Sequence, residues 1–319
     1  MEFSLHNYLK ELKSTNSSID YISVIQKNAV LLVENQLPVI LTLKQLSYII
    51  EIPHKYHIRI VKREINPYRV FSIKKRSGGK RYICIPDEYL LLTQKWIHNN
   101  ILCSDFAIKS LSSNVTAYIP KSSHIHNAKK HLGGEWILKL DITSFFESIS
   151  ERQVYYVFRN LGYRAIIAFE LSRICTRILD IPNDNRLRKK RWRSRKQWKH
   201  SNTNIVGHLP QGAPTSPMLA NLVCLKLDDD LKKIARNEGL TYTRYADDMT
   251  FSGTEKDFFT TQKYASSDSR LSSFSALTYK FNIEYEISDE VSFNIGANYY
   301  DQSTNLRATY LTAGIRYKF

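Results

Sequence analysis

Three aspartates are the residues of this chain that are best suited to chemistry. Asp247 and Asp248 are adjacent, and the residues on both sides of them favour β-structure. This pattern predicts a hairpin whose tight turn carries both carboxylates. Asp141 ends an apolar run at residues 136–140, which predicts a buried strand. Hard cations such as Mg²⁺ prefer oxygen ligands, so the three aspartates predict a two-metal site for phosphoryl displacement. For the adjacent pair alone, an exposed turn without a metal is the alternative.

Other segments must position these aspartates. The sequence Leu-Pro-Gln-Gly-Ala-Pro-Thr-Ser-Pro at residues 209–217 precedes a helix, which we expect Ser216 to cap, Pro217 to open and Gly239 to end. Its buried face is expected to hold the apolar residues Leu219, Leu222, Val223, Leu227, Leu231 and Ile234. Further helices are expected after Thr42 and from residue 86 to residue 102. Strands at 68–73 and 81–85 would flank a basic, Gly-containing turn.

The order of the motifs resembles the palm of reverse transcriptases. The aspartate strand, Pro-Gln-Gly and Tyr-Ala-Asp-Asp follow one another as they do in that family. Asn-Ala-x-x-His at residues 127–131 resembles a motif of the bacterial retron type. The resemblance covers residues 35–253 and implies an α/β (α+β) fold with the fingers and palm of a right-hand polymerase, in which helices back an antiparallel palm sheet. It also implies RNA-directed DNA polymerase activity.

The resemblance implies a role for each matching residue. Asp141, Asp247 and Asp248 would be catalytic and would hold two Mg²⁺ ions, with Mn²⁺ as an alternative ion and the carbonyl of Ile142 as a further ligand. Residues near the nucleotide, template or primer would be Lys75, Arg81, Phe146 as a steric gate, Gln211, Gly212, Asn127 and His131. For these positions, a solvated hairpin, an ordinary core side chain or an ordinary capped helix is the alternative.

A basic segment precedes the Pro-Gln-Gly motif. Residues 186–200 hold nine Lys or Arg and two Trp. Such a density of like charge disfavours a compact helix, whereas cations neutralise phosphates and tryptophans stack on bases. We therefore expect a nucleic-acid-binding arm, rather than a solvated loop, formed by Arg188, Lys189, Lys190, Arg191, Trp192, Arg193, Arg195 and Trp198.

Charge and composition indicate a polyanionic partner. The 319 residues include 46 Lys or Arg and 30 Asp or Glu, a net charge of +16. Residues 254–319 hold seven basic and eight acidic residues, so the excess lies before them. Four scattered cysteines, the lack of a secretory signal and the lack of a long apolar run predict a cytoplasmic protein with no membrane contact. For the family, the partners would be a structured non-coding RNA serving as template and primer, its cDNA and deoxynucleotides, with an effector protein as an optional addition and antiphage defence as the setting.

The character of the chain changes near residue 253. We expect a helical extension at 1–34, fingers and palm at 35–253, and an unrelated β-strand tail at 254–319. The tail alternates with period two and ends on a Phe, which resembles the last strands of outer-membrane β-barrels. The family's thumb and Val-Thr-Gly motif are not recognisable after Gly253. A chimera is the preferred interpretation, and a genuine β-module in place of the thumb is the alternative.

Three functions follow from these observations. The first is a retron-type polymerase whose activity is reduced by loss of the thumb. The second is a non-catalytic RNA-binding relic of such an enzyme. The third, an outer-membrane barrel fragment, rests on the tail alone.

Overall fold

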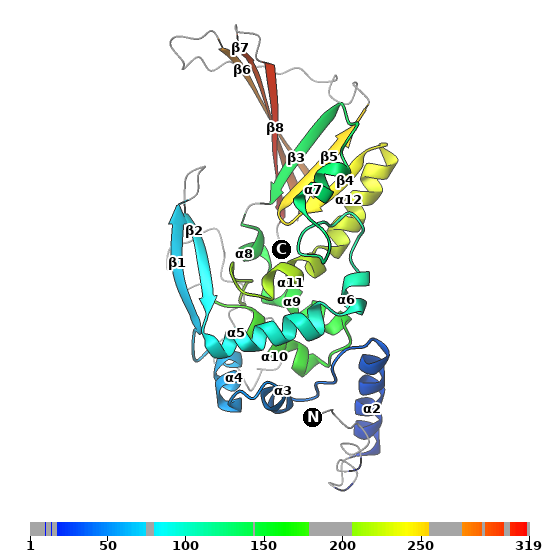
Figure 1. The fold of residues 1–319 in the computed structure, drawn as a ribbon, viewed down its shortest axis with the longest axis vertical. Coiled ribbons are helices and arrows are strands. Elements are labelled where there is room, and N and C mark those ends of the chain that lie inside the picture. The colour runs from blue at the N-terminus through cyan, green and yellow to red at the C-terminus, as the bar shows by residue number, and fades with distance from the viewer. Residues whose placement is uncertain are drawn as a thin grey trace. The chain divides into compact units, whose positions relative to one another are not determined.

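The computed structural model divides into two compact units, Met1–Leu111 with Phe146–Cys224 and Ser112–Phe145 with Leu225–Phe319 (Figure 1). It describes residues 10, 14, 18–74, 80–142, 144–178 and 206–254, and the backbone of 276–288, 291–302 and 307–317.

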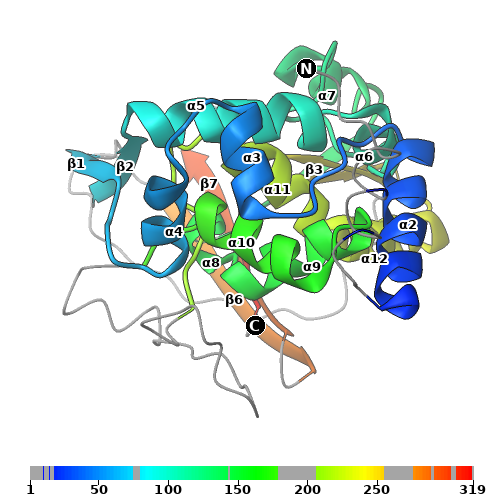
Figure 2. The same ribbon diagram turned by 90° about the horizontal axis from the view of Figure 1, so that it is seen from below.

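The first unit is mainly helical. Apolar side chains from its helices form the core, and Leu90, Ile97, Phe158 and Ile174 are fully buried. Figure 2 shows this group of helices from below. The elements are α2 (Ile19–Glu34), α3 (Leu43–Ile49), α4 (His54–Val61), α5 (Glu88–Ile97), the π-helix η1 (His98–Leu102), α6 (Asp105–Lys109), α9 (Glu151–Asn160), α10 (Ala165–Cys175) and α11 (Ser216–Val223). All but the first residue of the short helix α8 (Phe145–Ser148) also belong to this unit.

A two-stranded hairpin belongs to the same unit. Strands β1 (Tyr68–Lys74) and β2 (Lys80–Pro86) pair antiparallel, so that Val70 lies opposite Cys84 and Ile73 lies opposite Arg81. The prediction of two strands here is confirmed. So is the helix after Thr42, whose side chain accepts a hydrogen bond from the backbone N–H of Gln45 at 3.1 Å.

The second unit contains a sheet of six strands. Their order is β4-β5-β3-β8-β7-β6, and helices α7 (His124–Lys129) and α12 (Leu225–Asn237) belong to the same unit. The strands are β3 (Trp136–Ile142), β4 (Thr241–Tyr245), β5 (Asp248–Gly253), β6 (Ala276–Ser288), β7 (Val291–Gln302) and β8 (Arg307–Tyr317).

The two faces of β3, β4 and β5 differ in character. Leu140 lies opposite Met249 in the register, and both belong to a buried cluster with Leu231 and Ala235 of α12. Successive strand residues point to opposite faces, so the other face carries Asp141. The prediction of a strand at 136–140 is therefore confirmed, but only one of its faces is covered, because exposed and covered residues alternate along β3.

The helix that was expected from Ser216 to Gly239 is divided in two. Helix α11 begins one residue after Thr215, with Pro217 in its first turn, and ends at Val223. Helix α12 then runs to Asn237, and Gly239 follows it with a φ of +65°. The expected buried face holds at Leu219, Leu222 and Leu231, but Ile234 is 52% exposed.

The tail adds strands to the palm-like sheet. Strand β8 pairs in parallel with β3, and this register places Gly314 opposite Asp141. The three strands agree with the predicted period-two pattern, whereas the origin of the tail and the predicted domain boundaries stay predictions.

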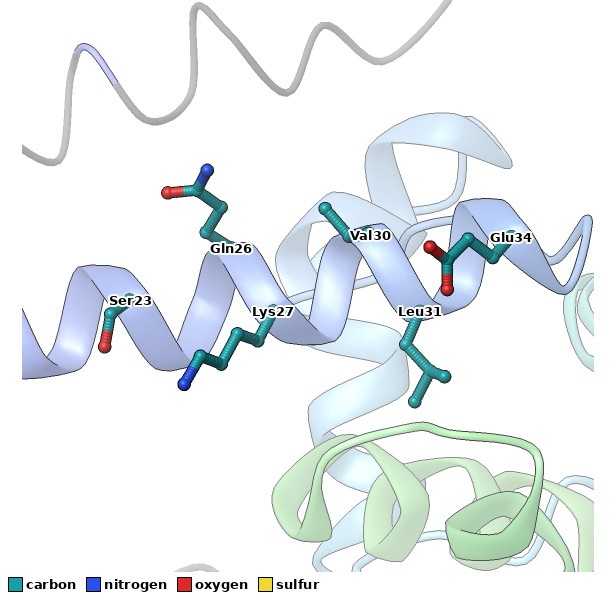
Figure 3. A pocket seen from close by; sticks show the side chains of 6 residues that line it. All are labelled: Ser23, Gln26, Lys27, Val30, Leu31 and Glu34. Carbon is teal, nitrogen blue, oxygen red and sulfur yellow. The ribbon is translucent and has the colours of Figure 1, made fainter.

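The surface of helix α2 carries a hollow. A hollow of about 590 Å³ lies along α2 and is lined by Ser23, Gln26, Lys27, Val30, Leu31 and Glu34 (Figure 3). All six residues come from one helix, and their side chains point in different directions, so no set of polar groups converges on a ligand there. Among the described helices, none is both long enough and apolar enough to cross a membrane.

Candidate active site

The predicted aspartates lie at one end of the β3–β5 pair. Asp141 and Asp248 are direct partners in the antiparallel register, and Tyr245 of β4 lies on the other side of Asp248. Residues opposite one another in such a pair have Cα atoms about 4.5–5.5 Å apart and share a face. Two carboxylates in this relation repel one another unless a cation separates them.

Asp247 belongs to the turn beside this pair. Its carbonyl oxygen accepts a hydrogen bond from the backbone N–H of Ile142 at 3.1 Å. The turn passes through Ala246, whose φ of +59° is a left-handed conformation that few residues with a Cβ adopt. Strand pairing and this hydrogen bond thus bring the backbones of the three aspartates side by side within one compact unit.

The side chains are less closely gathered than the backbone. Within the described ranges, no three His, Cys, Asp or Glu side chains form a group that could hold a metal ion. Instead, the Lys139 ammonium lies 3.5 Å from Oδ2 of Asp248, and both side chains are about half exposed. An exposed ion pair of this kind contributes little free energy, so a divalent cation could displace the lysine. The carboxylate oxygens of the three aspartates are, by their chemistry, the hard donors that Mg²⁺ prefers.

His131 lies in the interior beneath the hairpin. Its Nδ1 lies 2.7 Å from Oγ of Ser252, its Nε2 lies 2.7 Å from Oγ1 of Thr243, and the residue is only 6% exposed. Burial, together with the charge of Lys130, lowers the pKa of the ring. Both ring nitrogens of His131 thus have protein partners in a covered position, and its expected place near template or primer stays a prediction.

Asn127 also has a structural partner. Its side-chain oxygen accepts a hydrogen bond from Oγ1 of Thr116 at 2.7 Å, and the same hydroxyl lies 3.1 Å from the carbonyl oxygen of Arg244. The Asn-Ala-x-x-His motif therefore supports strands β4 and β5 from one side. The half-buried Asn127 keeps its predicted nucleic-acid contact as a prediction.

The Pro-Gln-Gly loop is attached to the basic hairpin in the first unit. The carbonyl of Gln211 accepts a hydrogen bond from the N–H of Cys84 at 2.8 Å. Gly212 has a φ of +108°, and a Cβ there would lie 2.9 Å from the carbonyl oxygen of Cys84. Only glycine fits this close approach, so the loop and strand β2 hold each other in place.

Two of the other residues predicted to contact nucleotide or nucleic acid lie within the described ranges. Arg81 is exposed on β2, and Phe146 is half-buried in α8. Lys75 and the basic arm lie outside the described residues, including Arg188, Lys189, Lys190, Arg191, Trp192, Arg193, Arg195 and Trp198. Their roles stay predictions.

A buried charge network that the sequence analysis missed supports the approach to the Pro-Gln-Gly loop. Glu151, which is fully buried, lies 2.6 Å from Nη2 of Arg63 and 2.6 Å from Nε of Arg173. It also accepts a hydrogen bond from the N–H of Gly207 at 2.8 Å. Burial opposes ionisation of Glu151, but the two guanidinium groups outweigh it and lower the pKa of the carboxyl. The Ser before Glu151 and the Gln two residues after it form a capping box, which was the only local signal.

Comparison with known families identifies the class of protein. A family model described as reverse transcriptase (RNA-dependent DNA polymerase) matches residues 73–275, which is more than half of the chain. The chain therefore belongs to the reverse transcriptase family. A second model, described as a protein of unknown function (DUF3570), matches residues 242–314, so the tail strands lie largely within that second match.

The chain is similar to curated proteins of the retron type. The retron Ec86 reverse transcriptase of Escherichia coli is 34% identical over 189 residues, which cover 58% of this chain and 48% of that protein. The retron Mx162 reverse transcriptase of Myxococcus xanthus is 35% identical over 193 residues, which cover 59% of this chain and 36% of that protein. The match thus spans less than half of either relative.

A solved structure of telomerase from Candida albicans, in complex with a fragment of telomeric RNA, aligns with 65% of this chain and 40% of that chain. Its sequence identity is 14% and its TM-score is 0.36, a similarity too low to define the fold.

Proposed function

We propose that this chain carries the fingers and palm of a retron-type RNA-directed DNA polymerase. The observation that carries the proposal is the register that sets Asp141 opposite Asp248, with Asp247 in the adjoining turn. Matching carboxylates in this order are what the family uses to hold its metal ions. When bound, two Mg²⁺ ions would activate the attacking primer hydroxyl and neutralise charge on the leaving pyrophosphate.

The other residues of the site serve binding and orientation. Arg81, with Lys75, would contact the triphosphate of the incoming deoxynucleotide, since Arg binds phosphate oxygens in pairs. Gln211 and Gly212 would contact the nucleotide and the template strand. Phe146 would exclude a ribose 2′-hydroxyl. The template would be a structured non-coding RNA, and antiphage defence would be the biological setting.

Primer extension with a matched inactive variant tests this proposal. Positioning is most of what phosphoryl transfer asks of a protein, and a displacement of about 1 Å can cost on the order of 100-fold in rate. Because the family's thumb is not recognisable here, we expect the 319-residue chain to bind RNA and to extend a primer poorly. A fusion of residues 1–253 with a retron thumb should synthesise DNA in Mg²⁺.

The control for the fusion is Asp247→Asn, which keeps the size of the side chain and removes its charge. Loss of synthesis in this variant would support the metal-binding role, whereas equal synthesis by both proteins would refute it. Processive synthesis by the chain alone would show that the tail replaces a thumb.

A second candidate function is RNA binding without catalysis. Two observations favour it: the described carboxylates form no group of three, and strand β8 pairs with β3 beside Asp141. Under this alternative the thumb fusion stays inactive but still binds RNA. In both cases, RNA affinity should fall steeply with salt, because each neutralised phosphate releases counterions.

A further inference from the structure

A fully buried ion pair lies beneath the aspartate turn and has no part in the roles assigned so far. Arg244 of β4 donates from Nε to Oδ1 of Asp228 at 2.8 Å and from Nη2 to Oδ2 at 2.6 Å. Both residues have a relative exposure of 0%. The hydroxyl of Tyr242 donates to Oδ1 of the same carboxylate at 2.8 Å. Helix α12 is thereby tied to strand β4 through charged groups inside the second unit.

The third nitrogen of the guanidinium reaches the turn itself. Nη1 of Arg244 donates to the carbonyl oxygen of Ala246 at 2.9 Å. That carbonyl belongs to the peptide group that joins Ala246 to Asp247. Ala246 has a φ of +59°, a conformation that a residue with a Cβ keeps only where its surroundings impose it.

The backbone of Arg244 is also fixed. Its N–H donates to the carbonyl of Asn114 at 2.9 Å, and its carbonyl accepts from the N–H of Thr116 at 2.9 Å. Main chain and side chain are therefore held together at the residue that precedes the Tyr-Ala-Asp-Asp sequence. A rigid guanidinium fork can engage the carboxylate and the carbonyl at once, which a single lysine ammonium cannot do.

Stability alone does not account for this arrangement. Buried ion pairs can often be replaced by apolar residues without loss of stability. The bond to the Ala246 carbonyl, in contrast, fixes the peptide group that joins Ala246 to Asp247.

We propose that Asp228 and Arg244 position the peptide between Ala246 and Asp247 and thereby set the carboxylates of Asp247 and Asp248 for a divalent cation. The inference rests on the proposed function, in which these carboxylates bind metal. Asp228 and Arg244 act through the turn and do not touch the cation.

Mn²⁺ affinity of the full 319-residue chain tests the inference without requiring activity. Free Mn²⁺ is followed by electron paramagnetic resonance during titration, and folding is checked by circular dichroism. The perturbing variant is Arg244→Lys, which keeps a charge near Asp228 but cannot make all three bonds. Tyr242→Phe is the matched control, because it removes one bond to Asp228 and leaves the bond to Ala246 intact.

We expect Arg244→Lys to weaken Mn²⁺ binding about 10- to 100-fold, as is typical when a group that orients a metal ligand is lost. Tyr242→Phe should bind Mn²⁺ as the wild type does. Wild-type affinity in Arg244→Lys, or an equal loss in Tyr242→Phe, would overturn the positioning role.

Two further measurements separate the possible failures. Asp247→Asn should abolish the specific binding, and if it binds as well as the wild type, the proposed metal site itself is wrong. If Arg244→Lys does not fold, the apolar triple variant Asp228→Leu, Tyr242→Phe, Arg244→Met replaces it, since buried charges removed together can leave the fold stable. Wild-type affinity in that folded variant would equally refute the inference.

Discussion

Replacement of Glu151 by Gln should destabilise the first unit strongly. The substitution preserves the shape of the side chain but leaves the guanidinium groups of Arg63 and Arg173, each 2.6 Å away, without a counter-charge. Breaking a buried ion pair costs about 3–5 kcal/mol, against a typical total stability of about 5–15 kcal/mol. Urea denaturation followed by circular dichroism at pH 7 measures this difference.

The pH dependence of the free energy of unfolding of the same variant is a second, independent test. The pKa of Glu151 is lower in the fold than its ordinary value of 4.5. Its contribution to stability is therefore complete above pH 4.5 and is lost as the pH falls through the lowered folded pKa. The deficit of Glu151→Gln should accordingly be largest near pH 7 and should shrink as the solution becomes acidic.

Glu64→Gln provides the control for the Glu151 experiment. Glu64 forms a partly exposed pair with Lys62 at 3.9 Å, and such pairs are worth about 0–1 kcal/mol. A loss below about 1 kcal/mol in Glu151→Gln, or a deficit that does not change with pH, would show that the buried network does not hold this part of the fold.

Four other outcomes are expected. Glu170→Gln should stabilise the chain near and above pH 7 and make no difference below pH 4.5. Burial raises the pKa of that carboxyl to about 7, so the folded state resists its ionisation. Denaturation at both pH values checks this. Gly212→Ala should destabilise by about 1–3 kcal/mol, since φ is positive there and the Cβ would meet the Cys84 carbonyl; thermal unfolding measures it. The wild type should lose stability below pH 6.5, because the ring of His131 gains a proton in the unfolded chain and resists it in the fold. His131→Asn should remove this loss, and a pH series of unfolding midpoints measures it. Lys139→Ala should tighten Mn²⁺ binding severalfold and change stability by less than about 1 kcal/mol, because the lysine competes for Asp248 only as an exposed ion pair.

Local patterns in the sequence predicted most of the elements that carry the site. Residues that favour β-structure on both sides of the aspartate pair located β4 and β5, and the apolar run before Asp141 located β3. The motif order predicted that Asp141 would join the aspartate pair in one site, and the register sets Asp141 opposite Asp248. These features depend on short-range propensity and on one strong motif, which is why a single sequence suffices to find them.

Charged residues in the interior could not be predicted in the same way. Asp228 stands in an acidic run on α12 that looks like a solvated face, yet it is fully buried. Arg244 lies on the same strand face as Tyr242, and alternation alone would assign an apolar residue there. The partner of each charge is 16 residues away in the chain, so the ion pair is visible only once α12 is placed against β4.

The structural contacts of the Asn-Ala-x-x-His motif likewise depend on residues far away in the chain. A histidine in a polar segment usually faces solvent, and the family context suggested nucleic acid. In the fold, His131 bridges the hydroxyls of Thr243 on β4 and Ser252 on β5 at 2.7 Å each. The guanidinium of Arg244 bonds to the turn of the same hairpin. The aspartate hairpin is thus held by polar contacts from His131 and, through Arg244, from Asp228 of α12. Such rigidity is what precise positioning of reacting groups requires.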